Sequence, residues 1–227
     1  RGWCGPVGRA AATGVPSGRP ALHHEGRAAA EVTVPRAMCA VSPHPGRQVP
    51  YVPRMSIPIR DVSVPIFVNA LRSMSAWLDK AASEKPEVEL FVQRLAPDMK
   101  PLPAQYQMAS DSAKNAVARL AGIEAPSMPD VEATFAELKE RCARTIAFVE
   151  GIDPAVLASG AERAVELKFP NGMGYRFNGQ AYLTGFALPN FFFHVTTAYG
   201  ILRSAGVGLG KIDYLQHLGP PTLPTAK

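Results

Sequence analysis

The chain has 227 residues, a formal net charge of +5 and a pI of about 9.2. Its basic excess lies in residues 1–54, which hold seven Arg and two Glu, while the remainder holds 17 basic and 17 acidic residues. A neutral domain lacks the positive face that binds nucleic acid, no apolar run is long enough to span a membrane, and the single cysteine after residue 54 cannot form an internal disulfide. We therefore expect a cytoplasmic protein with neither a nucleic-acid nor a membrane partner.

Residues 1–54 also differ from the rest in composition. They hold eight of the 22 prolines and seven of the 19 glycines, and such a segment buries too little apolar area to offset its ordering entropy. We expect 1–54 to be disordered, as an unprocessed extension or as sequence upstream of a natural start at Met55. The predicted domain covers residues 55–218, followed by a flexible tail over 219–227.

Three helices are predicted in the first half of the domain. From Val64, apolar residues recur at intervals of three and four over about five turns, with Ser63 as a possible cap. A short helix over Glu87–Leu95 precedes a long one over Leu102–Ala121. The buried face of that long helix is predicted to comprise Leu102, Tyr106, Ala109, Ala113, Ala116, Val117 and Leu120. Asp111 and Lys114 are expected to form an exposed ion pair.

A further helix and a hairpin follow. Asp130 is predicted to cap a helix whose buried side comprises Val131, Phe135, Leu138, Cys142, Ile146 and Val149. Arg141 is expected on its exposed side, and the position of Cys142 is typical of an inert core residue. Residues 164–169 and 174–178 then alternate in polarity around Asn171-Gly172, which predicts a β-hairpin.

The last helix is predicted from about Gly179 to Ser204. Pro189 lacks the N–H that a helix interior needs, so a kink is expected just before Asn190. Val207 to Leu218 is expected to fold back as an extended strap.

Polar side chains on this last helix mark the candidate site. Asn190, His194 and Thr197 share a stripe with apolar residues and should face the core, where Gln105 and Ser112 lie at the edge of the facing helix. These five residues are the predicted pocket lining. Phe192 and Tyr199 lie on roughly the opposite side, which favours a dimer contact.

The residues leave the chemistry of His194 open. A buried neutral imidazole with a hydrogen-bond partner is favoured over a metal ligand, because the stripe offers one histidine and no second ligand four residues away. No catalytic residue and no cofactor-binding residue is assigned. A divalent metal remains possible without being favoured, with His194 as its one assigned ligand.

Four segments resemble a known family: Ser63-Val64-Pro65, Arg94 to Met99, Ala133 to Leu138, and Leu188 to Tyr199. They are similar to a bacterial and fungal domain-of-unknown-function family, number nineteen ninety-three, which is placed beside the DinB/YfiT-like metalloenzymes. The likeness spans Met55 to about Leu215. It implies a four-helix bundle and three metal-binding histidines, one on the second helix and two, spaced by four, on the last. By position His194 matches one of the pair, whereas Ala198 occupies the place of the other, and Gln105 or Ser112 that of the third.

The predicted fold is therefore mainly α: an antiparallel four-helix bundle, DinB/YfiT-like, with a small β-hairpin before the last helix. The first functional hypothesis is small-molecule binding in the bundle cleft with a degenerate metal site. One alternative is a divalent-metal enzyme of the thiol-transferase kind, and another is a structural homodimer without a ligand. Whether the chain is an enzyme is left undecided.

Overall fold

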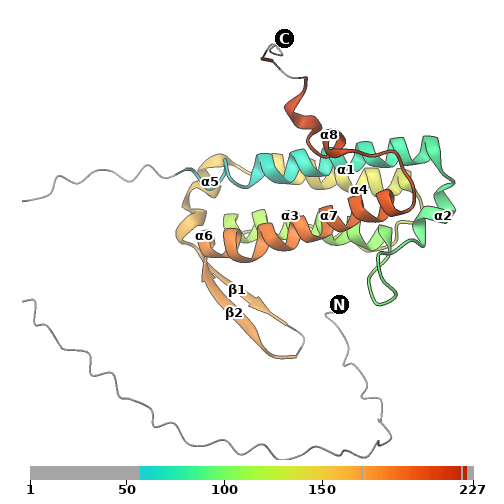
Figure 1. Cartoon of the computed structure of the whole chain (residues 1–227). Helices are drawn as coiled ribbons and strands as arrows, with labels where there is room; N and C mark the ends of the chain where they lie inside the picture. The colour runs from blue at the N-terminus through green and yellow to red at the C-terminus, as the bar shows by residue number, and fades with distance from the viewer. Residues whose placement is uncertain (1–56, 170, 221, 224–227) are drawn as a thin grey trace, which may run out of the picture. The chain divides into compact units, whose positions relative to one another are not determined.

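The computed structural model describes residues 57–169, 171–220 and 222–223, all within the second of two compact units, Met55–Lys227. The prediction for residues 1–54, and much of that for the 219–227 tail, lies outside the described residues. Four long helices form the bundle, as predicted: α1 (Val64–Glu84), α3 (Leu102–Ala121), α4 (Phe135–Glu150) and α7 (Leu188–Ser204) (Figure 1). Within the described residues, no helix is both long and apolar enough to cross a lipid bilayer.

The shorter elements connect these helices. Helix α2 (Glu87–Phe91) links α1 to α3, and α5 (Pro154–Ala158) with the short helix η1 (Ser159–Glu162) follows α4. Strands β1 (Ala164–Lys168) and β2 (Gly174–Asn178) form the predicted antiparallel hairpin, with Ala164 opposite Asn178 and Lys168 opposite Gly174. The chain then enters α7 through α6 (Gly179–Tyr182) and one π-helical turn, η2 (Leu183–Ala187).

Helix α3 forms where it was predicted because its apolar periodicity is unbroken. Its seven predicted face residues are all fully buried, and Gly122, at φ 70°, ends the helix in the left-handed conformation that glycine adopts without strain. The bundle core continues across the helices: Phe67 of α1 meets Phe191 of α7 edge to face at 4.9 Å, and the Tyr106 hydroxyl donates to the Met74 carbonyl at 2.8 Å. Cys142 is buried, which raises the pKa of its thiol to about 12 and keeps it protonated.

Helices α3 and α4 run in the same direction. Both begin beside α2: the N–H of Leu102 donates to the Gln93 carbonyl at 3.0 Å, and Phe135 stacks on Phe91 while its N–H donates to Glu87. Residues 122–134 must therefore return along the bundle between the end of α3 and the start of α4, and we call this segment the crossover. The pairs α3–α7 and α1–α4 are antiparallel neighbours (Figure 1).

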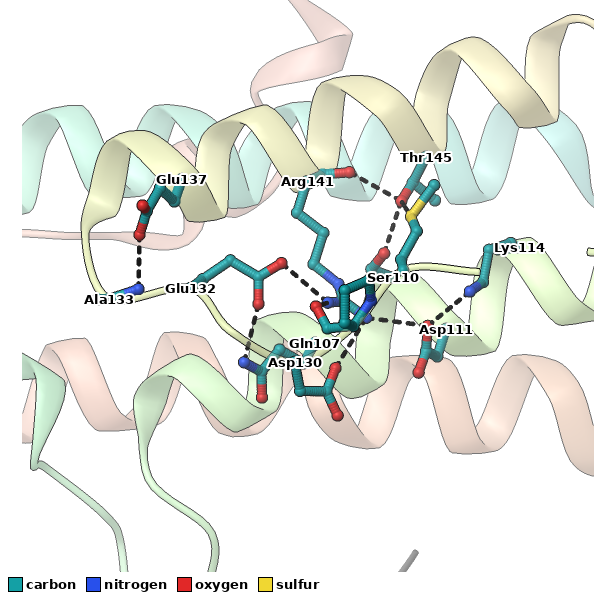
Figure 2. A network of polar contacts seen from close by, with 12 residues as sticks. Gln107, Ser110, Asp111, Lys114, Asp130, Glu132, Ala133, Glu137, Arg141 and Thr145 are labelled. Carbon is teal, nitrogen blue, oxygen red and sulfur yellow. Dashed lines mark hydrogen bonds and ion pairs between the residues drawn. The ribbon is translucent and has the colours of Figure 1, made fainter. Parts of the chain in front are cut away.

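Arg141 holds the crossover against the bundle (Figure 2). Its guanidinium is fully buried, which corrects the prediction that it is exposed. It forms ion pairs with Asp111 of α3 (3.0 Å) and with Asp130 (3.0 Å) and Glu132 (2.9 Å) of the crossover, and donates to the Pro129 carbonyl at 3.1 Å. Periodicity placed this residue away from the bundle axis, but the crossover covers that side.

Two further predictions change for the same reason. Lys114 is buried rather than exposed, because it donates to the Pro126 carbonyl of the crossover at 2.9 Å while pairing with Asp111 at 3.0 Å. Asp130 is committed to Arg141, so the N-cap of α4 is Thr134, whose hydroxyl and Glu137 form a reciprocal capping box. Val131 consequently lies outside the helix and is exposed.

The two ends of the domain also differ locally from expectation. Ser63 precedes α1 but its hydroxyl donates backward to the Ile59 carbonyl (2.6 Å) instead of capping the helix. The predicted extended strap contains α8 (Lys211–Tyr214) and the short helix η3 (Gln216–Leu218). It is fastened to α1 because the Asp213 carbonyl accepts from Trp77 Nε1 at 3.0 Å and the Asp213 carboxylate pairs with Lys80 at 3.2 Å.

Replacing Arg141 by Ala should lower the free energy of unfolding by about 3–5 kcal/mol, because it leaves the Glu132 carboxylate buried without its cation. Urea unfolding measures the loss. The control is Arg144→Ala on the exposed side of the same helix, for which a change within about 0.5 kcal/mol is expected. Equal effects of the two substitutions would show that the crossover does not depend on Arg141.

Candidate functional site

The predicted site residues meet where α3 packs against α7, a contact that we call the α3–α7 seam. Gln105 and Ser112 reach it from α3, and Asn190 and His194 from α7. Two side-chain hydrogen bonds cross the seam: His194 Nδ1 lies 2.9 Å from Gln105 Oε1, and Asn190 Nδ2 donates to Ser112 Oγ at 2.7 Å. The structure therefore brings together the polar residues of α3 and α7 that the sequence placed on facing sides of the two helices.

The proton on His194 is placed by a backbone group. Gln105 Nε2 donates to the Lys100 carbonyl at 2.9 Å, and a carbonyl only accepts, so the amide oxygen of Gln105 must face His194. Nδ1 of His194 therefore carries the hydrogen, and Nε2 carries the lone pair. Sequence reasoning missed Lys100 because a backbone carbonyl has no signal in the residue pattern.

His194 is held neutral. The residue is 9% exposed, and burial lowers the pKa of the imidazole to about 4. Within the described part of the chain, Nε2 makes no hydrogen bond. The ring thus offers one acceptor atom at the end of a chain of hydrogen bonds that fixes its orientation.

One aromatic ring lies next to this imidazole. Phe193 meets His194 edge to face at 5.2 Å and is 57% exposed. Phe192, which is 37% exposed, stands two residues before His194 and therefore lies on another side of the helix. Phe193 thus gives the neighbourhood of His194 an apolar surface in contact with solvent.

In the second hydrogen bond across the seam, the Ser112 hydroxyl has its partners within the chain. The Ser112 hydroxyl donates to the Met108 carbonyl of its own helix at 2.6 Å and accepts from Asn190, so its bonding capacity is largely used. Asn190 Oδ1, one turn before His194 on α7, has no hydrogen bond to the described residues and is left as a second acceptor. Both side chains are half-buried.

Thr197 uses its one hydrogen-bond donor within its own helix. It is buried on α7, but its hydroxyl donates to the Phe193 carbonyl of the preceding turn at 2.6 Å. This back-bond is the usual way in which threonine satisfies itself inside a helix. The structure therefore places Thr197 on the predicted stripe with its donor already used, so that only the lone pairs of the hydroxyl oxygen are left to accept.

The start of α7 adapts to Pro189. The π-helical turn Leu183–Ala187 lets the Leu188 N–H donate to the Leu183 carbonyl, five residues back, so the irregularity lies before Pro189 as expected from its missing N–H. The extra residue in this turn rotates the helix ahead of Asn190. Asn190 and His194 then follow in regular α-helix, which fixes their spacing along the seam.

The two candidate dimer residues differ in their surroundings. Phe192 is exposed, whereas Tyr199 is half-buried against Trp77 at 5.5 Å and Tyr214 at 5.6 Å. Tyr199 therefore already packs within its own chain, between α1 and α8. Its aromatic contacts stabilise the return of residues 207–218 onto the bundle.

The side chains of the seam do not fit a three-histidine metal site. Among residues 57–169, 171–220 and 222–223, no three His, Cys, Asp or Glu side chains are grouped closely enough to hold a metal ion. Ala198, where the resemblance implies a second histidine, is fully buried, and Gln105 binds the imidazole itself. A lone imidazole with an amide partner lacks the ligand number that Zn²⁺ requires.

Two hollows lie away from the seam. One, of about 440 Å³, lies on the hairpin and is lined by residues that include Glu166, Lys168 and Tyr175. The other, of about 240 Å³, lies between α1 and α4 beside Asp79 and Cys142. Neither is lined by any of the five predicted pocket residues.

Comparisons with known proteins agree with this architecture. The sequence profile of the family described as "Domain of unknown function (DUF1993)" matches residues 59–215. A crystal structure of a DinB family member protein from Shewanella denitrificans is similar, with 36% sequence identity and a TM-score of 0.64. The likeness covers 74% of this chain and 96% of that one. Among curated proteins, none matches this chain.

The profile match covers the whole bundle and the strap up to Leu215, and the similar structure has the same fold over nearly its full length. Both findings agree with the resemblance seen in the four sequence segments. The chain belongs to the family of domains of unknown function DUF1993 and is a DinB-like helical bundle.

Proposed function

We propose that the domain binds a small molecule at the α3–α7 seam through Nε2 of His194, without a metal ion. The observation that supports this proposal best is a nearly buried imidazole with one nitrogen locked by Gln105 and the other without a partner in the described chain. Nε2 is not among the described side-chain atoms that are fully buried without a partner, so water reaches it, and a donor group of a ligand can take the place of that water.

The chemistry of the seam indicates the class of ligand. Nε2 of His194 and Oδ1 of Asn190 both accept hydrogen bonds, and they lie one helical turn apart on α7. At neutral pH the imidazole is uncharged, because burial lowers its pKa to about 4, so it provides no attraction for an anion. The expected ligand is neutral, donates a hydrogen bond, and has an aromatic or apolar part to lie on Phe193.

Phenol and anisole test the proposal directly. Phenol should shift the NMR signals of the His194 ring in a saturable way, whereas anisole, which has no hydroxyl donor, should bind at least about 10-fold more weakly. His194→Asn is the informative variant because an asparagine amide can still donate to Gln105 but has no atom in the place of Nε2. It should lose the preference for phenol, while His217→Asn, at an exposed position, should keep it.

Two results would contradict the proposal. If phenol and anisole behave alike on the wild-type domain, Nε2 is not a binding atom. If protein purified without an affinity tag holds stoichiometric zinc or nickel that His194→Asn loses, the metal-dependent enzyme is the better assignment. The metal measurement and the phenol titration use the same two proteins, so the outcomes can be compared without a further variable.

The stability of the domain should fall between pH 7 and pH 5 because of His194. The unfolded chain binds a proton at a pKa of about 6.5, but the folded chain does so only near 4, so acid favours the unfolded state in this interval. The contribution of the neutral His194 to the free energy of unfolding is complete above the pKa of the unfolded chain, about 6.5, and is lost as the pH falls toward the pKa of the folded chain, about 4. From pH 7 to pH 5 the loss of unfolding free energy should be about 2 kcal/mol larger for wild type than for His194→Asn.

Urea unfolding of both proteins at the two pH values measures this difference. The other histidines and the carboxylates are common to the two proteins, so their titration cancels. The same pH dependence in both would mean that the imidazole is solvated in the folded state, which would also remove the basis for the binding site.

A further inference from the structure

The β-hairpin projects from the end of the bundle at which α6 begins (Figure 1). Its strands pair with each other and, among the described residues, with no other strand. A two-stranded hairpin is only marginally stable in water by itself, and its outer edges present unpaired backbone groups. Here a row of ring contacts supports it from the bundle side: Tyr175–Phe177 at 5.8 Å, Phe177–Tyr182 at 6.2 Å and Tyr182–Phe186 at 6.0 Å. The hairpin is thus a fixed arm with two open edges.

The ladder geometry shows which backbone groups lie on the open edge of β1. Phe169 N–H donates to the Met173 carbonyl at 2.8 Å, so the inward-facing groups recur at every second residue, on Leu167 and Val165. The N–H and C=O groups of Glu166 and Lys168 therefore point away from β2. Their side chains are 43% and 82% exposed, which leaves this edge accessible.

We propose that the open edge of β1 pairs with the same edge of a second copy of this chain, in antiparallel register centred on Leu167. Two-fold symmetry then places Glu166 of one copy opposite Lys168 of the other, twice. Both residues have outward-facing backbone groups, so the two pairs can form about four backbone hydrogen bonds across the axis. Side-chain charge and backbone geometry thus favour the same register.

The neighbouring registers and the other edge fit less well. Centring the pair on Glu166 would place two carboxylates directly opposite each other, which is destabilising. Strand β2 presents Arg176 on its outer edge, and symmetric pairing places that residue opposite itself, Gly174 or Asn178, none of which carries a negative charge. An edge that carries charges of one sign repels the same edge of a second copy, and proteins use this to prevent association. The edge of β1 instead carries one negative residue, Glu166, and one positive residue, Lys168, which complement each other across the two-fold axis.

Because the paired strands are short, the dimer should be weak, with a dissociation constant roughly in the micromolar range. Light scattering of the full chain over increasing concentration should show a reversible change from monomer to dimer. A particle that stays monomeric up to millimolar concentration would overturn the proposal.

Charge exchange tests the register. In Lys168→Glu, the new carboxylate lies opposite Glu166 of the second copy. In Glu166→Lys, the new ammonium lies opposite Lys168 of the second copy. Each variant alone should therefore dimerise at least about 10-fold more weakly than wild type. An equimolar mixture of the two should regain wild-type affinity, because every cross-axis pair is again of opposite sign. Lys168→Glu leaves the Glu166–Arg176 bridge of the hairpin intact but removes the 3.5 Å ion pair of Lys168 with Glu166 in its own strand. The mixture separates the two effects, because the change within the strand persists there while the pairs across the axis regain opposite charges.

Lys211→Glu is the matched control, since it makes the same charge change at an exposed position outside the hairpin. It should dimerise like wild type. A dimer that persists in Lys168→Glu, or a mixture that stays as weak as its components, would overturn the pairing along β1. These measurements do not involve His194, so their failure leaves the proposed ligand site untouched.

Discussion

The bundle depends on one buried cation. Helices α3 and α4 run in the same direction, so the chain between them has to return along the bundle, and Arg141 fixes that return through Asp130, Glu132 and the Pro129 carbonyl. Burying a guanidinium is costly unless it is paired, and three carboxylates and a carbonyl bind its two terminal nitrogens here, while Nε has no hydrogen-bond partner among the described residues. The geometry of these partners ties the crossover to one position, so α3 and α4 are held side by side.

The order of helices that follows from this arrangement places α3 against α7. Along that seam a glutamine and a histidine meet where the family resemblance implies metal ligands. Amide and imidazole satisfy each other directly, and the Lys100 carbonyl decides which nitrogen holds the proton. The hydrogen bond from His194 to Gln105 fixes the imidazole ring and leaves Nε2 as a neutral acceptor.

Periodicity in the sequence was sufficient to predict the elements whose residues contact other regular helices or strands. The bounds of α3 and the hairpin around Asn171-Gly172 follow from local pattern, because each residue's surroundings there are set by its own element. Periodicity failed at Arg141 and Lys114, since it reports which side of a helix a residue occupies but not what lies over that side. A non-regular crossover leaves no periodic signal, and so the burial of these two charges could not be read in advance.

The candidate site shows the same division. Helical periodicity predicted that Gln105 and Ser112 meet His194 and Asn190. It could not predict the tautomer of His194, because the tautomer depends on the backbone carbonyl of Lys100 in a connecting segment.

The hairpin and the seam are parts of one continuous stretch of chain. Strand β2 leads through α6 and the π-helical turn into the helix that carries Asn190 and His194. Gly179 stands at the junction, where a side chain would overlap the Gly160 carbonyl, so the backbone there can pass η1 only as glycine. Because backbone packs on backbone at this point, the direction in which the hairpin leaves the bundle is coupled to the start of α7. Contacts made along β1 would therefore brace the helix that presents His194, which gives the projecting arm a structural relation to the proposed ligand site.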